Sequence, residues 1–139
     1  MRLSRDQILG FLEQWNQAWE AHDLEGVLAG FSEDVVFENW TGGRVQGLAA
    51  LRQAWGPWFA DHGGFRFVFE DLFADAEGQK ALYRWALHWP SPEKGFQGQP
   101  EVRRGVDVLH FRDGKIAQKY TYCKTTVEIS GQRVRLTAG

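Results

Sequence analysis

The sequence predicts an α+β fold in which three N-terminal helices pack on one face of a curved antiparallel sheet. Up to about residue 60, apolar residues recur at helical spacing, and from about residue 65 they alternate with a period of two. Helices followed by meandering strands favour this fold class. At 139 residues the chain is most simply one domain, residues 1–139, long enough to bury a core without disulfides or a structural metal.

The first helix is predicted over residues 5–21. Ser4 is a suitable N-cap, and Gln7 completes the pattern of a capping box. We interpret His22 as a cationic residue at the C-terminus of this helix. A short second helix is expected over residues 24–31, and a third begins after Gly47. The apolar stripes of the first and third helices consist of Ile8, Phe11, Leu12, Trp15 and Trp19, and of Leu48, Leu51, Trp55, Trp58 and Phe59.

Strands are predicted over residues 35–40, 65–70, 81–89, 102–111 and 115–128. The last two flank Asp113-Gly114, a strong signal for a two-residue hairpin turn. Residues 91–100 contain several Pro and Gly residues and are predicted to form a loop. The polar residues after Gly131 are expected to form a short extension.

Composition and charge argue against several kinds of partner. The net charge of −2 and the mixing of both signs argue against a nucleic-acid surface or a patch for anionic membranes. A single cysteine, Cys123, excludes an intramolecular disulfide and indicates a reducing compartment, so we expect a cytoplasmic protein. No segment approaches the roughly 18 apolar residues of a membrane span. The sequence has no pair of His or Cys at metal-ligand spacing, no phosphate-binding loop and no nucleophile elbow, so neither a metal nor a cofactor is predicted.

Aromatic residues are abundant, with 7 Trp and 10 Phe. They indicate either an aromatic-rich core or a cavity shaped for a flat apolar ligand.

The second feature that bears on function is Asp107, an acid within the apolar strand GVDVLHF of residues 105–111. Its carboxyl group either faces water or faces a cavity. Burial without a cationic partner would favour the neutral acid, which can donate a hydrogen bond to a developing oxyanion.

Several segments carry a resemblance to a known family. The segments AWEAHDLEG (18–26), FSEDVVF (31–37), GLAALR (47–52) and VDVLHFRDGKI (106–116), in this order, resemble the nuclear transport factor 2-like superfamily. Within it, the SnoaL-like polyketide cyclases and the ketosteroid isomerases are most similar. The resemblance extends from about residue 4 to residue 126 and implies a cone-shaped sheet around the helices, with an apolar pocket open at one end and a homodimer formed through the outer face of the sheet.

The resemblance also places individual residues. Asp107 falls where ketosteroid isomerases keep a protonated aspartic acid that stabilises an enolate. Trp15 stands in place of their helix tyrosine and can donate a hydrogen bond through its indole. Asn39 replaces their general base, cannot accept a proton at neutral pH, and is therefore expected to be a polar ligand contact.

Pairing outward from the hairpin turn predicts which residues share the face of Asp107. An uninterrupted ladder puts Asp107 opposite Tyr120 and Gly105 opposite Tyr122, so that Tyr120 could share a hydrogen bond with Asp107. Arg103 is then opposite Lys124, and this basic pair would suit a ligand with a carboxylate or enolate group. For both tyrosines, an ordinary packing role is the alternative.

Two functions are compatible with these residues. The first is a cofactor-independent isomerase, lyase or cyclase that acts on a small, largely apolar, possibly acidic carbonyl compound. In it Asp107, with Tyr120, stabilises the enolate and His88 is the candidate general base. The ligand-binding residues would be Trp15, Asn39, Trp40, Trp55, Trp58, Arg103, Tyr122 and Lys124. The second is a non-catalytic ligand-binding or dimeric scaffold module.

Overall fold

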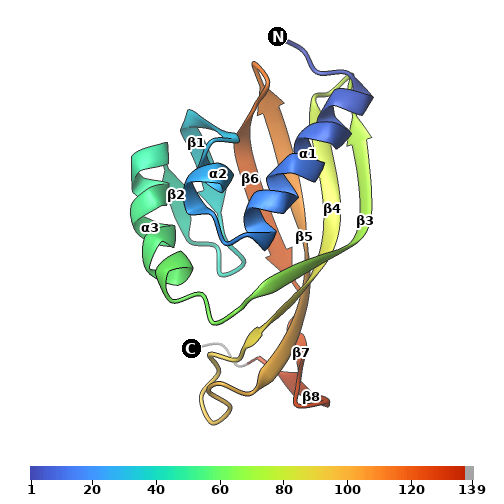
Figure 1. Ribbon diagram of the computed structural model, residues 1–139. Helices are drawn as coiled ribbons and strands as arrows, with labels where there is room; N and C mark the ends of the chain where they lie inside the picture. The colour runs from blue at the N-terminus through green and yellow to red at the C-terminus, as the bar shows by residue number, and fades with distance from the viewer. Residues whose placement is uncertain (137–139) are drawn as a thin grey trace.

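The computed structural model describes residues 1–136 and shows three helices followed by a long, bent sheet (Figure 1). The helices are α1 (Arg5–Glu20), α2 (Leu24–Leu28) and α3 (Leu48–Ala60). The strands are β1 (Phe31–Glu38), β2 (Arg44–Gln46), β3 (Arg66–Asp75), β4 (Lys80–Pro90), β5 (Pro100–Arg112), β6 (Lys115–Cys123), β7 (Thr126–Ile129) and β8 (Gln132–Arg135). The predicted α+β class is confirmed.

Local sequence explains where the helices begin. The Ser4 side chain accepts a hydrogen bond from the backbone N–H of Gln7, and the Gln7 side chain accepts one from the backbone of Ser4, which completes the predicted capping box. At the other end, His22 terminates α1 as predicted, at a positive φ of 54°: its backbone N–H donates to the carbonyl oxygen of Trp19 at 3.1 Å, an arrangement found at helix C-termini. Its side chain does not interact with the end of the helix, because Nε2 donates to the carbonyl oxygen of Phe65 at 2.6 Å. His22 therefore ties the end of α1 to the segment that enters β3.

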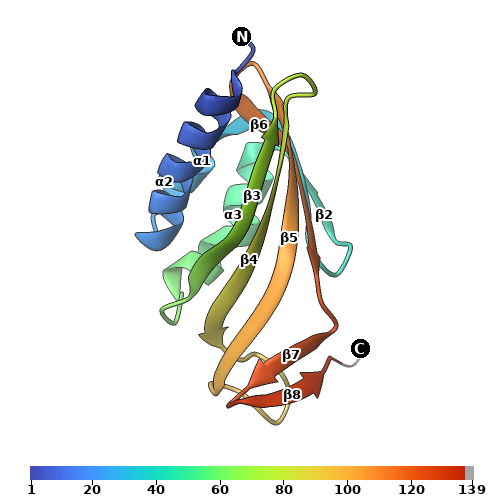
Figure 2. The same ribbon diagram turned by 90° about the vertical axis from the view of Figure 1, so that its right-hand side faces the viewer.

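The main strands lie in the order β2-β1-β6-β5-β4-β3. Neighbouring strands are antiparallel except for β1 and β6, which are parallel. Phe31 was expected in the second helix but begins β1, where it pairs with Ile116 of β6. All three helices cover one face of the sheet, and the opposite face carries no helix, as the edge-on view shows (Figure 2). Residues of β1, β3, β4, β5 and β6 that point toward the helices form the core with the apolar stripes of α1 and α3.

The C-terminal strands differ from the prediction. The expected strand over residues 115–128 is divided into β6 and β7, because β7 leaves β6 and pairs with the first residues of β5. The chain then turns at Ser130 and Gly131, which both have positive φ, and β8 pairs with β7. The small β7–β8 hairpin lies at the far end of the sheet from the N-terminus (Figures 1 and 2).

A β-bulge near the hairpin turn makes the predicted β5–β6 register wrong. Phe111 pairs with Ile116 as expected, but His110 pairs with Gln118, so that Ala117 is an extra residue in β6. Every later pair is displaced by one residue, and such a shift exchanges the two faces of a strand. Asp107 therefore lies opposite Thr121 rather than Tyr120, and Gly105 lies opposite Cys123.

Across residues 1–136, no helix has the length and apolar character needed to cross a membrane. The cytoplasmic location stays a prediction.

Candidate ligand-binding cavity

An aromatic cavity of about 270 Å³ lies between the helices and the concave face of the sheet. Its walls come mainly from α1, α3 and the strands β1, β3, β4, β5 and β6. The apolar lining residues are Trp19, Phe37, Trp40, Trp55, Trp58, Phe67, Phe69, Tyr83, Trp85 and Trp89, and the polar ones are Asn39, Asp107, Lys119 and Thr121. The aromatic content therefore supplies both a core and the walls of a hollow.

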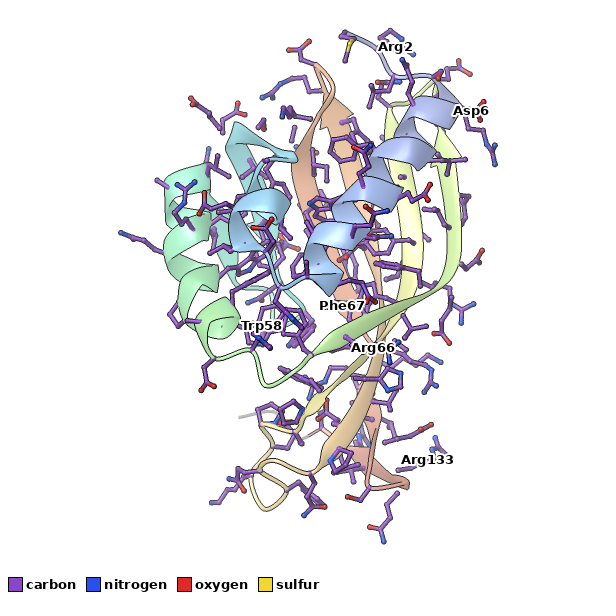
Figure 3. The ribbon with its side chains drawn as sticks, viewed as in Figure 1. Arg2, Asp6, Trp58, Arg66, Phe67 and Arg133 are labelled. Atoms are coloured by element: carbon purple, nitrogen blue, oxygen red, sulfur yellow. The ribbon has the colours of Figure 1, made fainter. Side chains whose placement is uncertain are left out.

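Strand periodicity explains how these rings come to face one space. Side chains two residues apart share a face, so Tyr83, Trp85 and Trp89 of β4 all point toward the helices. Phe67 of β3 lies beside them, with its ring centroid 5.3 Å from that of Trp85 in an edge-to-face arrangement. Trp58, near the end of α3, also lines the cavity; Figure 3 labels Trp58 beside the last turn of α3 and Phe67 just below the C-terminal end of α1.

The polar group of the cavity is a buried cluster of Asp107, Lys119 and Thr121. Asp107 is 3% exposed and Lys119 is 5% exposed. Lys119 Nζ donates to Asp107 Oδ1 at 3.0 Å and to Thr121 Oγ1 at 2.7 Å, and the Thr121 hydroxyl donates to the same Asp107 oxygen. The three side chains thus form a closed triangle of hydrogen bonds at one wall of an otherwise aromatic space.

This cluster corrects the expectation that Asp107 is buried without a cationic partner. Lys119 supplies that partner, so the condition under which the neutral acid was expected is not met. Burial lowers the pKa of the Lys119 ammonium, and this effect outweighs Asp107, whose charge and hydrogen bond raise it. The Lys119 ammonium also lies 4.8 Å from the centroid of the Phe37 ring, an arrangement that favours a cation over an aromatic face.

Tyr83 is a further polar side chain beside Asp107. The two residues are directly opposite each other on β4 and β5, and both line the cavity. Burial, the negative charge of Asp107 and hydrogen bonding to it raise the pKa of the Tyr83 hydroxyl well above its usual value. Tyr83 is therefore a neutral hydrogen-bond donor throughout the physiological pH range, in the position for which the sequence had suggested Tyr120.

Four of the residues predicted to contact a ligand line the cavity: Asn39, Trp40, Trp55 and Trp58. The Asn39 carboxamide oxygen is occupied by the adjacent loop, since it accepts hydrogen bonds from the backbone N–H groups of Thr41 at 3.0 Å and Gly43 at 2.9 Å. Asn39 therefore lines the cavity and also stabilises the turn between β1 and β2.

Other predicted site residues lie elsewhere. Trp15 is buried in the core, and its Nε1 donates to the Val27 carbonyl oxygen at 2.9 Å, so this donor is already used. His88 is exposed, because it alternates with the inward-facing residues of β4. Tyr120, Tyr122 and Lys124 are absent from the cavity wall; Tyr122 is 55% exposed, and Tyr120 packs edge-to-face on His110, 5.7 Å between ring centroids. The bulge at Ala117 is the physical reason why both tyrosines point away from the cavity.

Arg103 points to the same side as Asp107 but belongs to a second buried cluster. Its Nε and Nη2 each donate to one carboxylate oxygen of Glu101 at 3.0 Å, a bidentate pair. The indole N–H of Trp89 and the hydroxyl of Ser91 also donate to Glu101, which is 1% exposed. The guanidinium of Arg103 is therefore bound by Glu101 and is not an open site for an acidic ligand. The predicted pairing of Arg103 with Lys124 is wrong.

Gly105 lies in close contact with its neighbours and leaves no empty space for a ligand. A Cβ atom at this position would lie 2.5 Å from Cζ2 of Trp85 and 2.3 Å from the carbonyl oxygen of Tyr122. The glycine therefore allows the indole of Trp85 to lie directly on the strand backbone, which shapes the cavity wall.

Lys119 and Thr121 are site residues that the sequence did not predict. Alternation counted from the turn assigned both to the outer face, and only the bulge reverses that assignment. The sequence holds one signal: Ile116 and Ala117 are adjacent apolar residues, which interrupts the alternation expected of a strand with one covered face. Within residues 1–136, no group of three or more His, Cys, Asp or Glu side chains is placed to hold a metal ion.

Comparison with known proteins identifies relatives of this architecture. The family model described as SnoaL-like domain matches residues 12–119. A solved structure of a candidate polyketide cyclase from Xanthomonas campestris pv. campestris is similar at 24% identity, covering 85% of this chain and 90% of the other, with a TM-score of 0.70. An NTF2-like protein of unknown function from Mesorhizobium loti has 26% identity, coverage of 86% and 93%, and a TM-score of 0.68.

A further similar structure is that of TerC co-crystallised with polyporic acid, at 18% identity, coverage of 86% and 92%, and a TM-score of 0.71. A sequence comparison with curated proteins finds no match.

Proposed function

The chain belongs to the SnoaL-like domain family, and from this membership we propose that it binds a small, flat, largely apolar carbonyl compound and isomerises it through an enolate without a cofactor. The observation that carries the proposal is the Asp107–Lys119 pair, which lines an aromatic cavity. A carboxylate and an ammonium group side by side can remove a proton from carbon and stabilise the negative charge that develops on oxygen.

The ion pair changes the roles expected from the sequence. Asp107 was expected to stabilise the enolate as a neutral acid, whereas its contact with Lys119 favours the carboxylate as the base. Lys119, supported by Thr121, then donates to the enolate oxygen, and Tyr83 is a second donor close to Asp107. The proton taken by the Asp107 carboxylate returns to a different carbon of the bound enolate, which completes an isomerisation and leaves the pair unchanged.

The cavity walls support a flat apolar substrate. Rings from six tryptophans line the space, and aromatic side chains favour stacking or edge contacts with planar molecules. Two of these residues, Trp19 and Trp85, carry indole N–H groups that are buried and have no hydrogen-bond partner within residues 1–136. Leaving such buried donors unpaired costs free energy.

Deuterium exchange tests this proposal. The protein is incubated in deuterated water with a panel of 1,3-dicarbonyl compounds and enones, and exchange at the acidic carbon is followed by NMR. We expect Asp107→Asn to lower the rate by about a hundredfold to ten-thousandfold, as is usual when a general base is removed. Asp71→Asn, which alters an exposed acid on β3, is the matched control and should exchange like the wild type. Exchange that is equally fast in Asp107→Asn would contradict the assignment of Asp107.

A non-catalytic binding module is the second candidate. It is favoured by the closed hydrogen bonding of the cluster, in which one Asp107 oxygen already accepts from both Lys119 and Thr121. Such a protein would change its tryptophan fluorescence when the same compounds bind, yet catalyse no exchange with any of them. That combination of results would replace the isomerase by the binding module.

We also propose that a second copy of the chain covers the outer face of the sheet. Val68, Phe73 and Tyr122 on this face are exposed, and Leu82 and Val106 line a groove of about 380 Å³ there. We expect the protein to sediment as a homodimer and Tyr122→Glu to sediment as a monomer, because a buried charge without a partner disfavours association. Glu77→Gln, on the loop between β3 and β4, is the control. A monomeric wild type at micromolar concentration would argue against this interface.

A further inference from the structure

Lys119 differs from the other lysines in its surroundings. Lys80, Lys94, Lys115 and Lys124 are all exposed, whereas Lys119 is 5% exposed and lines the aromatic cavity. Its Nζ is 4.8 Å from the centroid of the Phe37 ring and 5.8 Å from that of Trp55. An amine placed between aromatic rings in a space large enough for a ligand is positioned to meet a bound molecule rather than water.

The neighbours of Lys119 also suit reaction at this nitrogen. Asp107 Oδ1 lies 3.0 Å from Nζ and can receive a proton from it, and Thr121 Oγ1 at 2.7 Å holds the amine in place. A lysine becomes nucleophilic when it is desolvated and when a nearby group accepts its proton. Burial supplies the first condition, since it lowers the pKa of Lys119, and Asp107 supplies the second.

We propose that Lys119 forms an imine with aldehydes or ketones that enter the cavity, with Asp107 as the proton carrier. This inference rests on the proposed binding of carbonyl compounds at the same site, and it adds a covalent step that proton transfer alone does not require.

The step balances within the pair. Nζ of Lys119 first gives one proton to the Asp107 carboxylate, and the neutral amine attacks the carbonyl carbon. Asp107 returns that proton to the carbonyl oxygen, which forms a carbinolamine. A second proton then moves from nitrogen to Asp107 and on to the hydroxyl group, which leaves as water. The product is a protonated imine beside the Asp107 carboxylate, and the single co-product is one water molecule.

The imine would widen the chemistry of the site. A protonated imine draws electrons from the neighbouring carbon more strongly than a carbonyl does, so bonds to that carbon become easier to break. The class of substrates would then extend from acidic 1,3-dicarbonyl compounds to simple aldehydes and ketones.

Reductive trapping tests the proposal. The protein is incubated with naphthaldehyde and sodium cyanoborohydride at pH 7, digested, and analysed by peptide mass spectrometry. We expect the reduced label mainly on the peptide that contains Lys119, because each unit by which the pKa of an amine falls gives roughly ten times more free amine. Label at the N-terminal amine of Met1 is counted separately, since any exposed α-amine also reacts.

Variants and a second ligand sharpen this test. Lys119→Met should lose the cavity label, and the charge-neutral double variant Asp107→Asn/Lys119→Met should lose it as well while avoiding an unpaired buried charge. Lys124→Met, at an exposed position, should be labelled like the wild type. Label spread evenly over the exposed lysines, with none on Lys119, would overturn the proposal.

Naphthylmethanol, which has no carbonyl group, separates this inference from the proposed function. If naphthylmethanol quenches the tryptophan fluorescence but naphthaldehyde leaves Lys119 unlabelled, the cavity binds such compounds and the imine is refuted. If neither compound binds, both the proposed function and the imine fail. Label on Lys119 that is blocked by excess naphthylmethanol would establish both ligand binding in the cavity and the imine.

Discussion

Lys119→Met is expected to lower the free energy of unfolding by about 3–5 kcal/mol, the usual cost of removing one partner of a buried ion pair. The methionine fills a similar volume, so the main effect is electrostatic. Asp107, 3% exposed, keeps the hydrogen bond from Thr121 but loses its cation. Urea denaturation at pH 7, followed by tryptophan fluorescence, measures the change as a shift of the midpoint.

The double variant Asp107→Asn/Lys119→Met isolates the charge. We expect it to recover most of the lost stability, because replacing both ions of a buried pair by neutral residues is often nearly neutral. Lys124→Met, which removes an exposed lysine without a buried partner, should leave the midpoint close to that of the wild type. A single Lys119→Met variant as stable as the wild type would show that the pair is not desolvated in solution.

Arg103→Met is expected to have a comparable effect, about 3–5 kcal/mol, for the same physical reason. Glu101 is 1% exposed and would keep its hydrogen bonds from Trp89 and Ser91 but lose both bonds from the guanidinium. Urea denaturation at pH 7 measures the change as a shift of the midpoint.

The neighbouring Arg104 provides the matched control. It faces the other side of β5, where its ion pairs with Glu70 and Glu128 are partly exposed. Pairs of this kind contribute about 0–1 kcal/mol, so Arg104→Met should change stability much less than Arg103→Met. Equal losses of stability in the two variants would mean that the burial of Arg103 does not increase its contribution to stability over that of Arg104.

These two buried pairs have different relations to the cavity. The pair Asp107–Lys119 lines the space, so its charges can act on a ligand. The pair Glu101–Arg103 is further along the same face of β5 and is closed by Trp89 and Ser91, and its arginine lies 5.0 Å from the centroid of the Trp40 ring. We therefore assign chemistry to the first pair and support of the cavity wall to the second.

Local patterns in the chain were sufficient for the fold class. The capping box at Ser4, the helical stripes and the period-two segments each depend on interactions between residues close in sequence, and the structure contains the elements that they predict. They also placed Trp55 and Trp58 on the inner side of α3, whereas alternation left the face of Asp107 open and the resemblance to the superfamily selected the inner one. A face is a local property, since it follows from the spacing of side chains along one helix or strand.

The partner of Asp107 was decided only by the tertiary structure. Which residue of β6 faces it depends on the pairing of two strands, and one extra residue, Ala117, exchanges the faces of everything beyond it. Tyr120 was thereby moved outward, Lys119 was moved inward, and an acid expected to be alone became half of an ion pair. The sequence determined that an acid would lie within an apolar strand of an aromatic-rich protein, whereas the cavity that it faces and the cation beside it were set by the packing of strands and by a bulge that alternation does not reveal.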